Sequence, residues 1–321
     1  MGTQDNFNER VFFMKVLVTG GTGFVGRSLV KKLVENNHEV ILLTRNSEAA
    51  KQALPFPLKI FKWDPEAFTP PKEAYDNIDA IVHLAGESIA AGRWNDKQKT
   101  RIMNSRVLST RNLLTGLIAS GAKPKVLVLA SAIGIYGNRG NETLLENSPQ
   151  GIGFLADVCR AWEKEGSQPG LPSIRTVNLR IGVVLGKEGG ALAKLIPLFK
   201  LGAGGPVGSG KQWMSWIHKE DLVEMILFAL SHENISGPIN AVAPNPATNA
   251  QFSSALGKAL NRPAFMPAPA IALKIALGEM SELVLASQKV EAKKITDCSF
   301  VFKYPKVQEA LDQICKKIPK R

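Results

Sequence analysis

A glycine-rich turn between a buried strand and a helix constrains this chain more than any other feature. Residues 15–19 (KVLVT) form a short apolar run with two valines, which is typical of a buried parallel strand. Residues 20–26 (GGTGFVG) follow with the spacing G-x-x-G-x-x-G, and residues 27–37 then place leucines and valines at helical spacing. A second apolar strand follows at 38–43 (HEVILL). The sequence therefore predicts a βαβ unit with an anion site at the start of its helix.

Glycine is physically required at three positions of this turn. Gly20 lets the chain turn tightly, Gly23 lets backbone N–H groups approach a pyrophosphate, and Gly26 lets the helix pack against the strand. The diphosphate of a dinucleotide then lies at the helix N-terminus, where free N–H groups and the positive end of the dipole favour an anion. The residues predicted to bind the cofactor here are Gly20, Thr22, Gly23, Phe24, Val25 and Gly26.

The residues after the second strand indicate which dinucleotide binds. An NAD-specific protein usually places an acidic residue there, on the ribose 2′-hydroxyl, whereas this chain has Thr44 and Arg45. A guanidinium can grip a 2′-phosphate with two hydrogen bonds, and the threonine can add a hydroxyl donor. The alternative is an ordinary surface arginine after a strand. The sequence favours NADP(H) as the cofactor.

Length and charge limit the other possibilities. A chain of 321 residues with 45% apolar content can bury the core of one large α/β domain or two closely joined ones. Every apolar stretch is interrupted by charge before about 18 residues, so we expect no membrane span. The excess of 40 Lys and Arg over 28 Asp and Glu favours anionic ligands, although a solvated basic surface explains it as well. Because no aromatic residues interleave with the basic ones, we do not expect nucleic-acid binding.

The N-terminus and the cysteines bear on the cellular location. Residues 1–13 lack the apolar core of a secretory signal, and we interpret them as a disordered extension. The strand pattern begins at Met14, which leaves open a later translation start or an organelle-targeting segment. Cys159, Cys298 and Cys315 are widely spaced, which suits neither a disulfide framework nor a zinc site. We expect a cytoplasmic protein without a bound metal, an organelle stroma or matrix being the alternative.

Three strings give the chain a family resemblance: TGGTGFVG at 19–26, HLAGE at 83–87 and SAIGIYG at 131–137. The chain resembles the extended short-chain dehydrogenase/reductases, which include nucleotide-sugar epimerases and dehydratases. More narrowly, AGESIAAGRWNDKQKTRIMNSR at 85–106 and GGPVGSGKQWMSWIH at 204–218 resemble a branch called epimerase family proteins, sometimes labelled SulA-like cell-division inhibitors. The resemblance implies a doubly wound parallel Rossmann sheet of about seven strands with a smaller C-terminal substrate domain.

The resemblance also implies further cofactor contacts. It places Asp64 near the adenine and the backbone near Val184 at the nicotinamide amide. It also places Leu84, Ala85 and Gly86 along the adenine ribose. The apolar strand 78–84 ends in Ala85 and Gly86, and small residues at a strand end let a flat cofactor lie close. On the next predicted helix, two cations are placed to reach cofactor phosphate or substrate, or else to form a solvated helix face. These cations are Arg101 and Arg106.

The usual catalytic pair of the superfamily is missing. Its chemistry needs a Tyr as acid/base and a Lys four residues later, because a phenol near pKa 10 is a poor base unless a cation stabilises the phenolate. In the corresponding helix, one register gives Phe154 and Val158, and the register anchored on Glu163 gives Leu155 and Cys159. Both registers lack both groups. Cys159 lies on an apolar stripe, and we interpret it as a buried small hydrophobe rather than a nucleophile.

Two other groups remain as catalytic candidates. Ser131 could orient a substrate oxygen, although the family's active Ser or Thr aligns nearer Ala132. His218 is the best remaining titratable group, since a histidine near pKa 6.5 exchanges protons at neutral pH. The competing interpretation, which we favour, is structural: Asp221 caps the following helix and His218 packs at the domain seam.

The substrate side of the pocket is predicted from the second half of the chain and from two aromatic residues. The glycine-dense loop 204–213 lacks P-loop spacing, so we interpret it as a lid whose N–H groups and lysine hold an anion. Tyr136 is interpreted as a pocket wall rather than a base, because no lysine follows it by four residues. The residues predicted to line this pocket are Glu87, Tyr136, Lys211 and Trp216.

These observations predict a domain plan. We expect a disordered extension at 1–13, followed by a Rossmann domain from 14–184 and 217–245. A C-terminal substrate or cap domain takes residues 185–216 and 246–321.

The sequence is consistent with two functions. The first is an NADP(H)-dependent oxidoreductase or epimerase-like enzyme of atypical mechanism, acting on an unknown small carbonyl or nucleotide-sugar substrate. The second is a non-catalytic NADPH-binding sensor or interaction protein linked to cell division. A homodimer is an option that the resemblance leaves open.

Overall fold

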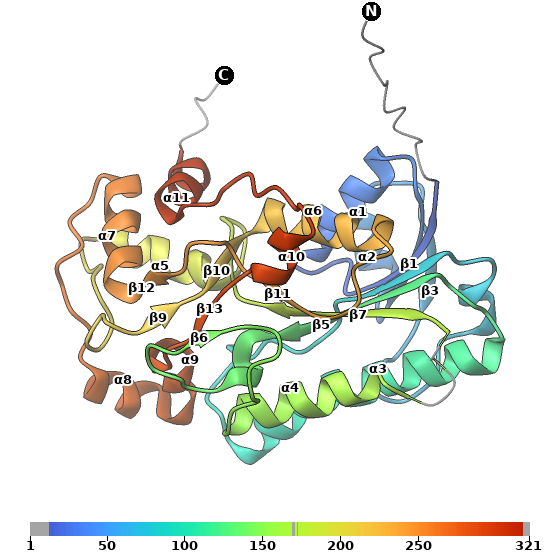
Figure 1. Cartoon of the computed structure of the whole chain (residues 1–321), viewed down its shortest axis with the longest axis horizontal. Helices are drawn as coiled ribbons and strands as arrows, with labels where there is room; N and C mark the ends of the chain where they lie inside the picture. Colours follow the sequence, from blue (N-terminus) through green and yellow to red (C-terminus); the bar gives the residue numbers. More distant parts are fainter. Residues whose placement is uncertain (1–12, 169–170, 172, 317–321) are drawn as a thin grey trace, which may run out of the picture.

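A seven-stranded parallel sheet forms the centre of the molecule (Figure 1). The computed structural model describes residues 13–168, 171 and 173–316. The order of the strands is β11-β7-β5-β4-β1-β2-β3, and every pairing among them is parallel. The strands are β1 (Lys15–Thr19), β2 (Glu39–Thr44), β3 (Lys59–Lys62), β4 (Ala80–His83), β5 (Val126–Ala132), β7 (Arg175–Ile181) and β11 (Gly237–Ala241). The predicted doubly wound Rossmann sheet is confirmed.

Helices cover both faces of the sheet (Figure 1). One face carries α1 (Gly26–Glu35), α2 (Ser47–Ala53), α6 (Lys219–Ser231) and α10 (Lys293–Asp297). The other face carries α3 (Asp96–Ser120), α4 (Phe154–Glu165) and the short helix η1 (Lys72–Tyr75) (Figure 1). Because side chains alternate along a strand, neighbouring residues such as Leu17 and Val18 enter the separate cores on the two faces. Burial on both faces explains why β1 and β2 are nearly continuous apolar runs, in which apolar residues do not alternate with polar ones.

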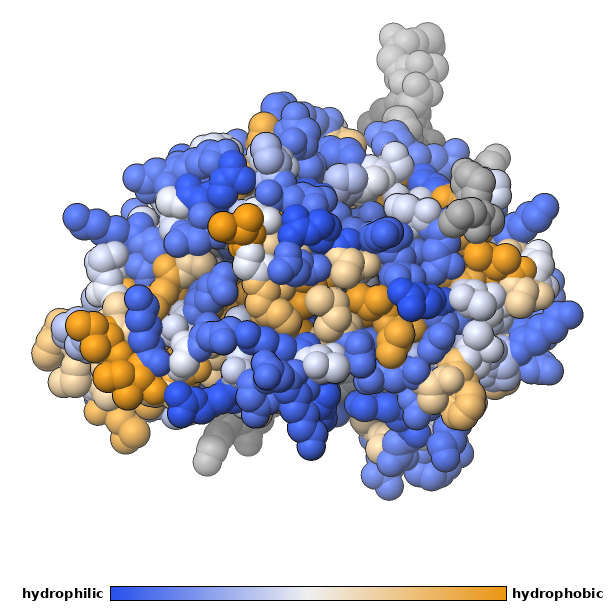
Figure 2. All heavy atoms as spheres, turned by 90° about the horizontal axis from the view of Figure 1, so that it is seen from below, coloured by the Kyte–Doolittle hydropathy of each residue, from blue (hydrophilic) through white to orange (hydrophobic). Residues whose placement is uncertain are grey.

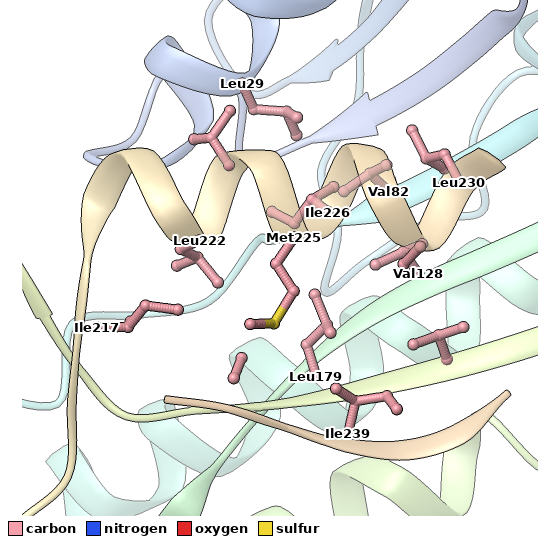
Figure 3. Packing of buried hydrophobic residues seen from close by; sticks show 14 of the residues in the cluster. Leu29, Val82, Val128, Leu179, Ile217, Leu222, Met225, Ile226, Leu230 and Ile239 are labelled. Carbon is pink, nitrogen blue, oxygen red and sulfur yellow. The ribbon is translucent and has the colours of Figure 1, made fainter. Parts of the chain in front are cut away.

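The core beneath α6 shows how this packing is built. Leu222, Met225 and Ile226 point from α6 toward the strands, where Val128 of β5 and Leu179 of β7 meet them (Figure 3). All five side chains are fully buried. The apolar stripe of α6 therefore fixes the helix on the sheet and so fixes the position of its first residues.

A smaller C-terminal domain has its own apolar core, which gathers residues of α5, α7 and α11. Its elements are β8 (Val183–Leu185), α5 (Gly190–Lys200), β9 (Trp213–Met214), β10 (Trp216–His218), β12 (Ala247–Thr248), α7 (Asn249–Leu260), α8 (Ala270–Leu277), η3 (Gly278–Ser281), α9 (Glu282–Leu285) and α11 (Val307–Cys315). Helix α8 buries none of its residues, and apolar side chains gather at its end of the molecule (Figure 2). The smaller domain is confirmed.

One C-terminal segment returns to the large domain. Strand β13 (Lys289–Val290) pairs with β6 (Thr143–Leu144), which follows the short helix η2 (Ile133–Tyr136). Side chains from 290–300 belong to the large core, on the face that carries α6. The predicted domain bounds, which assign all of 246–321 to the cap, stay a prediction, and residues 1–12 of the predicted extension lie outside the described residues.

No helix in the described part of the chain is long and apolar enough to cross a membrane.

Candidate functional site

The glycine turn has the close backbone contacts that its spacing predicts. Gly20 has a φ of +70°, and a Cβ on it would lie 2.7 Å from the carbonyl carbon of Leu84. A Cβ on Gly26 would lie 2.1 Å from the carbonyl oxygen of Gly20, so only glycine lets α1 begin against the turn. Gly23 is exposed, as the approach of a phosphate requires. The turn lies at the carboxyl end of β1, beside β4, where the strand order reverses and dinucleotides bind.

Phe24 points away from this turn toward the loop after β8. Cβ atoms built on Gly186 and Gly189 would lie 2.7 and 2.6 Å from its ring. The ring therefore packs directly against the backbone at two positions where a larger residue would collide with it. The ammonium of Lys219 sits 5.2 Å from the ring centroid and also pairs with Glu188 at 2.7 Å. Phe24 therefore joins the cofactor loop to the smaller domain, a contact that sequence reasoning missed.

The end of β2 leaves one cation free. Thr44 is half-buried, and its hydroxyl donates to the carbonyl of Asn46, whose side chain in turn caps α2. Arg45 is exposed, and its guanidinium has no hydrogen bond or ion pair with any of the residues described in the structure. Asp64 is also exposed, two residues past β3, and accepts a hydrogen bond from the Glu66 N–H at 3.2 Å. The adjacent ends of β2 and β3 thus present Arg45 and Asp64 to solvent.

A buried histidine supports the neighbouring strand end. His83 lies at the end of β4 with its Nδ1 2.6 Å from Thr19 Oγ1 and its Nε2 3.0 Å from Thr110 Oγ1. The Thr19 hydroxyl also accepts a hydrogen bond from the Ala85 N–H at 3.3 Å. Complete burial lowers the pKa of His83 to about 4, so the ring is neutral at pH 7. These hydrogen bonds fix the strand ends that flank the glycine turn. The sequence did not predict them.

The two arginines of α3 differ in environment. Arg101 is exposed and pairs with Glu87 at 3.4 Å. Arg106 is half-buried, stacks 5.2 Å over Trp162, and lies against Gly86, where a built Cβ would be 3.3 Å from its Cζ. Burial lowers the pKa of Arg106, but a guanidinium stays charged at any physiological pH. Arg106 is thus a fixed cation beside the small residues that follow β4.

Ser131 belongs to a buried polar network. Its hydroxyl donates to Glu163 at 2.6 Å, and Glu163 accepts two hydrogen bonds of 2.9 Å from Arg180. Arg180 also donates to the phenol oxygen of Tyr136, which donates in turn to Asn240 at 2.6 Å. Each side chain therefore already has a partner, and the predicted catalytic role of Ser131 stays a prediction.

Two predicted pocket walls are enclosed by protein. Tyr136 is held in this network and is fully buried, and burial raises its pKa. Trp216 is also fully buried, with its indole N–H donating to the Asn245 carbonyl at 3.1 Å. The polar atoms of both side chains are used in internal hydrogen bonds, and their predicted place in the pocket wall stays a prediction.

The structure distinguishes the two registers of α4. Leu155 and Cys159 face Gly134 of η2, whose built Cβ would lie 3.3 Å from Leu155 Cβ and 3.6 Å from Cys159 Sγ. Phe154 and Val158 instead pack with Trp94 against α3. Leu155 and Cys159 therefore face the carboxyl end of β5. Burial raises the pKa of Cys159 to about 12, in line with the prediction of an inert thiol.

His218 and Asp221 have structural contacts. The Nδ1 of His218 accepts a hydrogen bond from the Glu220 N–H and so caps α6, while its Nε2 lies 3.1 Å from Gln313 Oε1. The prediction that Asp221 caps this helix is wrong: it lies inside the first turn, and its carboxylate accepts the N–H groups of Lys303 and Tyr304. His218 does pack at the domain seam, as predicted, and burial lowers its pKa. Its catalytic role stays a prediction.

The remaining predicted residues lie in the smaller domain. Val184 is half-buried in β8, paired in parallel with Ile217 of β10. Lys211 is exposed in the glycine-dense loop. This loop borders a pocket of about 480 Å³, whose lining includes Asn138, Ser209, Gln212, Lys274 and Glu282. The loop borders this pocket, and both its predicted role as a lid and the role of Lys211 stay predictions.

Residues 16–241 match the NAD dependent epimerase/dehydratase family. The chain belongs to this family. Residues 268–314 match a further domain of unknown function, DUF1731, in the smaller domain. The resemblance inferred from the sequence motifs is confirmed.

Relatives within this epimerase family cover almost the whole chain. The chloroplastic SDR39U1 homolog of Arabidopsis thaliana is 42% identical over 94% of this chain and 86% of its own length. YfhF of Bacillus subtilis is 40% identical over 94% of this chain and 98% of its own length. The crystal structure of human SDR39U1 (isoform 2) with NADPH superimposes with a TM-score of 0.85 at 35% identity, covering 94% of this chain and 99% of that one.

Proposed function

We propose that this protein binds NADP(H) and is an oxidoreductase or epimerase-like enzyme of atypical mechanism. The observation that carries the proposal is Arg45, a free cation at the end of β2 where the adenine ribose of a dinucleotide lies. A guanidinium there complements the 2′-phosphate that distinguishes NADP from NAD. The glycine turn, with its Cβ-excluding contacts, supplies the pyrophosphate site. The NADPH in the human SDR39U1 structure supports the same choice.

The chain's own residues suggest how such a site works. A bound nicotinamide would supply or accept a hydride. Arg106 of α3 lies against Gly86, which follows β4, and Leu155 and Cys159 of α4 face Gly134, which follows β5, so we expect these side chains to border its half of the cleft. Leu155 and the buried Cys159 offer no group that titrates near neutral pH, so the proposed proton donor is water, a substrate group or His218. The substrate is a small carbonyl or nucleotide-sugar compound, and the protein acts in the cytoplasm or an organelle matrix.

Replacing Arg45 tests the cofactor choice. We expect Arg45→Ala to weaken NADPH binding about ten- to a hundredfold, because charged hydrogen bonds contribute about 1.5–3 kcal/mol. NADH binding should stay nearly unchanged, since NADH lacks the 2′-phosphate. Titrations followed by nicotinamide fluorescence measure both affinities.

The matched control is Lys51→Ala, which removes an exposed cation from α2 that pairs with Glu48. It lowers the net charge equally, so it should leave NADPH binding within about twofold. An Arg45→Ala variant that binds NADPH as tightly as the wild type would remove the basis for NADP specificity. Failure of the wild type to bind either nucleotide would overturn the proposed function.

A non-catalytic NADPH sensor or interaction protein is the second candidate, and the Leu155–Cys159 face of α4 favours it. At neutral pH these side chains cannot perform the proton transfer of a Tyr/Lys pair. Screening carbonyl compounds and nucleotide sugars for NADPH oxidation separates the two candidates. Turnover supports the enzyme, whereas tight NADPH binding without turnover supports the sensor. A link to cell division and a homodimer stay predictions.

A further inference from the structure

Helix α5 of the smaller domain contacts two loops that border the cofactor site. Its N-terminal residues form the first contact: Gly189 and Gly190, where the helix begins, pack on the ring of Phe24 in the glycine turn. The contact is close, because a Cβ on Gly189 would lie 2.6 Å from that ring. The ion pair between Lys219 and Glu188 also holds this loop, with the Lys219 ammonium 5.2 Å from the centroid of the Phe24 ring. The start of α5 is therefore fixed to the pyrophosphate end of the site.

One turn later, α5 makes its second contact. Lys194 donates a hydrogen bond of 3.0 Å to the carbonyl oxygen of Ala90, in the loop between β4 and α3. That loop begins with the small residues at the end of β4 and also reaches the smaller domain through Arg93, which donates to the Ile275 carbonyl at 3.1 Å. Helix α5 thus joins the glycine turn to the β4–α3 loop.

A dinucleotide would lie between these two loops. The strand order reverses between β1 and β4, and a dinucleotide bound at that point crosses the carboxyl ends of both strands. The glycine turn follows β1, and the loop carrying Ala90 follows β4. A helix attached to both loops spans the cleft between them.

We propose that α5 is the outer wall of the dinucleotide site and that Lys194 is the positioning residue that holds it closed. The inference rests on the proposed function, since it takes NADP(H) as the occupant. Phe24 fixes the start of α5 through close ring contacts, and Leu192 and Phe199 fix the rest of the helix in the core of the smaller domain. The contact of α5 with the β4–α3 loop depends instead on one exposed hydrogen bond. Exposed polar contacts exchange easily with water. The Lys194 contact is therefore the one that opens when the cofactor enters or leaves.

Cofactor release from Lys194→Ala tests this proposal. Protein loaded with NADPH is mixed in a stopped-flow instrument with excess NADP⁺, and the loss of nicotinamide fluorescence gives the dissociation rate. We expect Lys194→Ala to release NADPH about three- to tenfold faster, the effect of losing one hydrogen bond. Lys194→Arg should restore a rate close to that of the wild type, because it can reach the same carbonyl. The melting temperatures of all variants should agree, since the contact is exposed.

Lys200→Ala is the matched control, because it removes an exposed lysine from the C-terminal end of the same helix. A wild-type release rate in Lys194→Ala, or an equal acceleration in Lys200→Ala, would overturn the proposal.

Hydrogen exchange separates the failure of this inference from the failure of the proposed function. In the cofactor-free protein, Lys194→Ala should increase amide exchange in residues 87–95, and Lys200→Ala should not. If the wild type binds no NADPH, the proposed function fails and α5 covers no dinucleotide, whatever the exchange shows. If the wild type binds NADPH but amide exchange in residues 87–95 is the same in the wild type and Lys194→Ala, the Lys194 contact does not hold the loop. The inference about α5 then fails while the proposed function stands.

Discussion

A single neutral histidine joins three elements around the glycine turn. His83 on β4 contacts Thr19 at the end of β1 and Thr110 on α3, and both hydroxyls lie within 3.0 Å of its ring. Burial lowers the pKa of His83 from 6.5 to about 4, so the folded protein binds this proton less readily than the unfolded chain does. The neutral ring therefore makes its full contribution to the unfolding free energy above pH 6.5, and this contribution is lost as the pH falls toward 4.

The change His83→Asn tests this linkage. Between pH 6.5 and pH 4 the wild type should lose about 3 kcal/mol more of its unfolding free energy than the variant, because one pKa unit corresponds to about 1.4 kcal/mol. Urea unfolding at a series of pH values gives this difference. At pH 7 the variant should be less stable, since asparagine cannot span both hydroxyls. Equal pH slopes in the two proteins would show that His83 does not titrate during unfolding.

At the scale of elements, α4 is held to the sheet by a buried ion pair. Glu163 and Arg180 of β7 are 12% and 6% exposed and share two hydrogen bonds. Removing one partner leaves the other charge buried, so we expect Glu163→Gln to lower the unfolding free energy by about 3 kcal/mol. Chemical denaturation measures the loss.

The same helix supplies a control. Asp157, near the start of the helix, pairs with Arg160, and the two side chains are 59% and 43% exposed. Because exposed pairs contribute little, Asp157→Asn should cost less than about 1 kcal/mol. Equal losses in the two variants would mean that burial does not set the strength of the Glu163 pair.

Elements were predictable from the sequence where the pattern is local. The strand predicted at 15–19 is β1 with identical bounds, and the one predicted at 38–43 differs from β2 by one residue at each end. Contacts between distant residues were not predictable. His83 and Thr19 are 64 positions apart, and no periodicity indicates which polar group a buried ring will meet. Asp221 was misassigned because His218 supplies a competing acceptor at the start of the same helix.

At the scale of the whole molecule, the two domains share their cores. Val290 and Ile295, which lie in sequence between α9 and α11 of the smaller domain, are fully buried in the large core. Ser215 in the smaller domain accepts the Val290 N–H at 2.9 Å and donates to the Gln288 carbonyl at 2.8 Å. The chain therefore crosses between the domains several times, and neither core can lose its packing without disturbing the other.

This shared packing predicts a single cooperative unfolding transition. If NADPH binds in the cleft bordered by both domains, saturation at a hundred times the dissociation constant adds about 2.7 kcal/mol to the folded state. For a chain of this length the whole transition should then move up by roughly 4 °C. Calorimetry with and without NADPH checks both the number of transitions and the shift. Two transitions, of which NADPH moves only one, would show that the smaller domain unfolds independently, because a ligand stabilises only the unit whose folding forms its site.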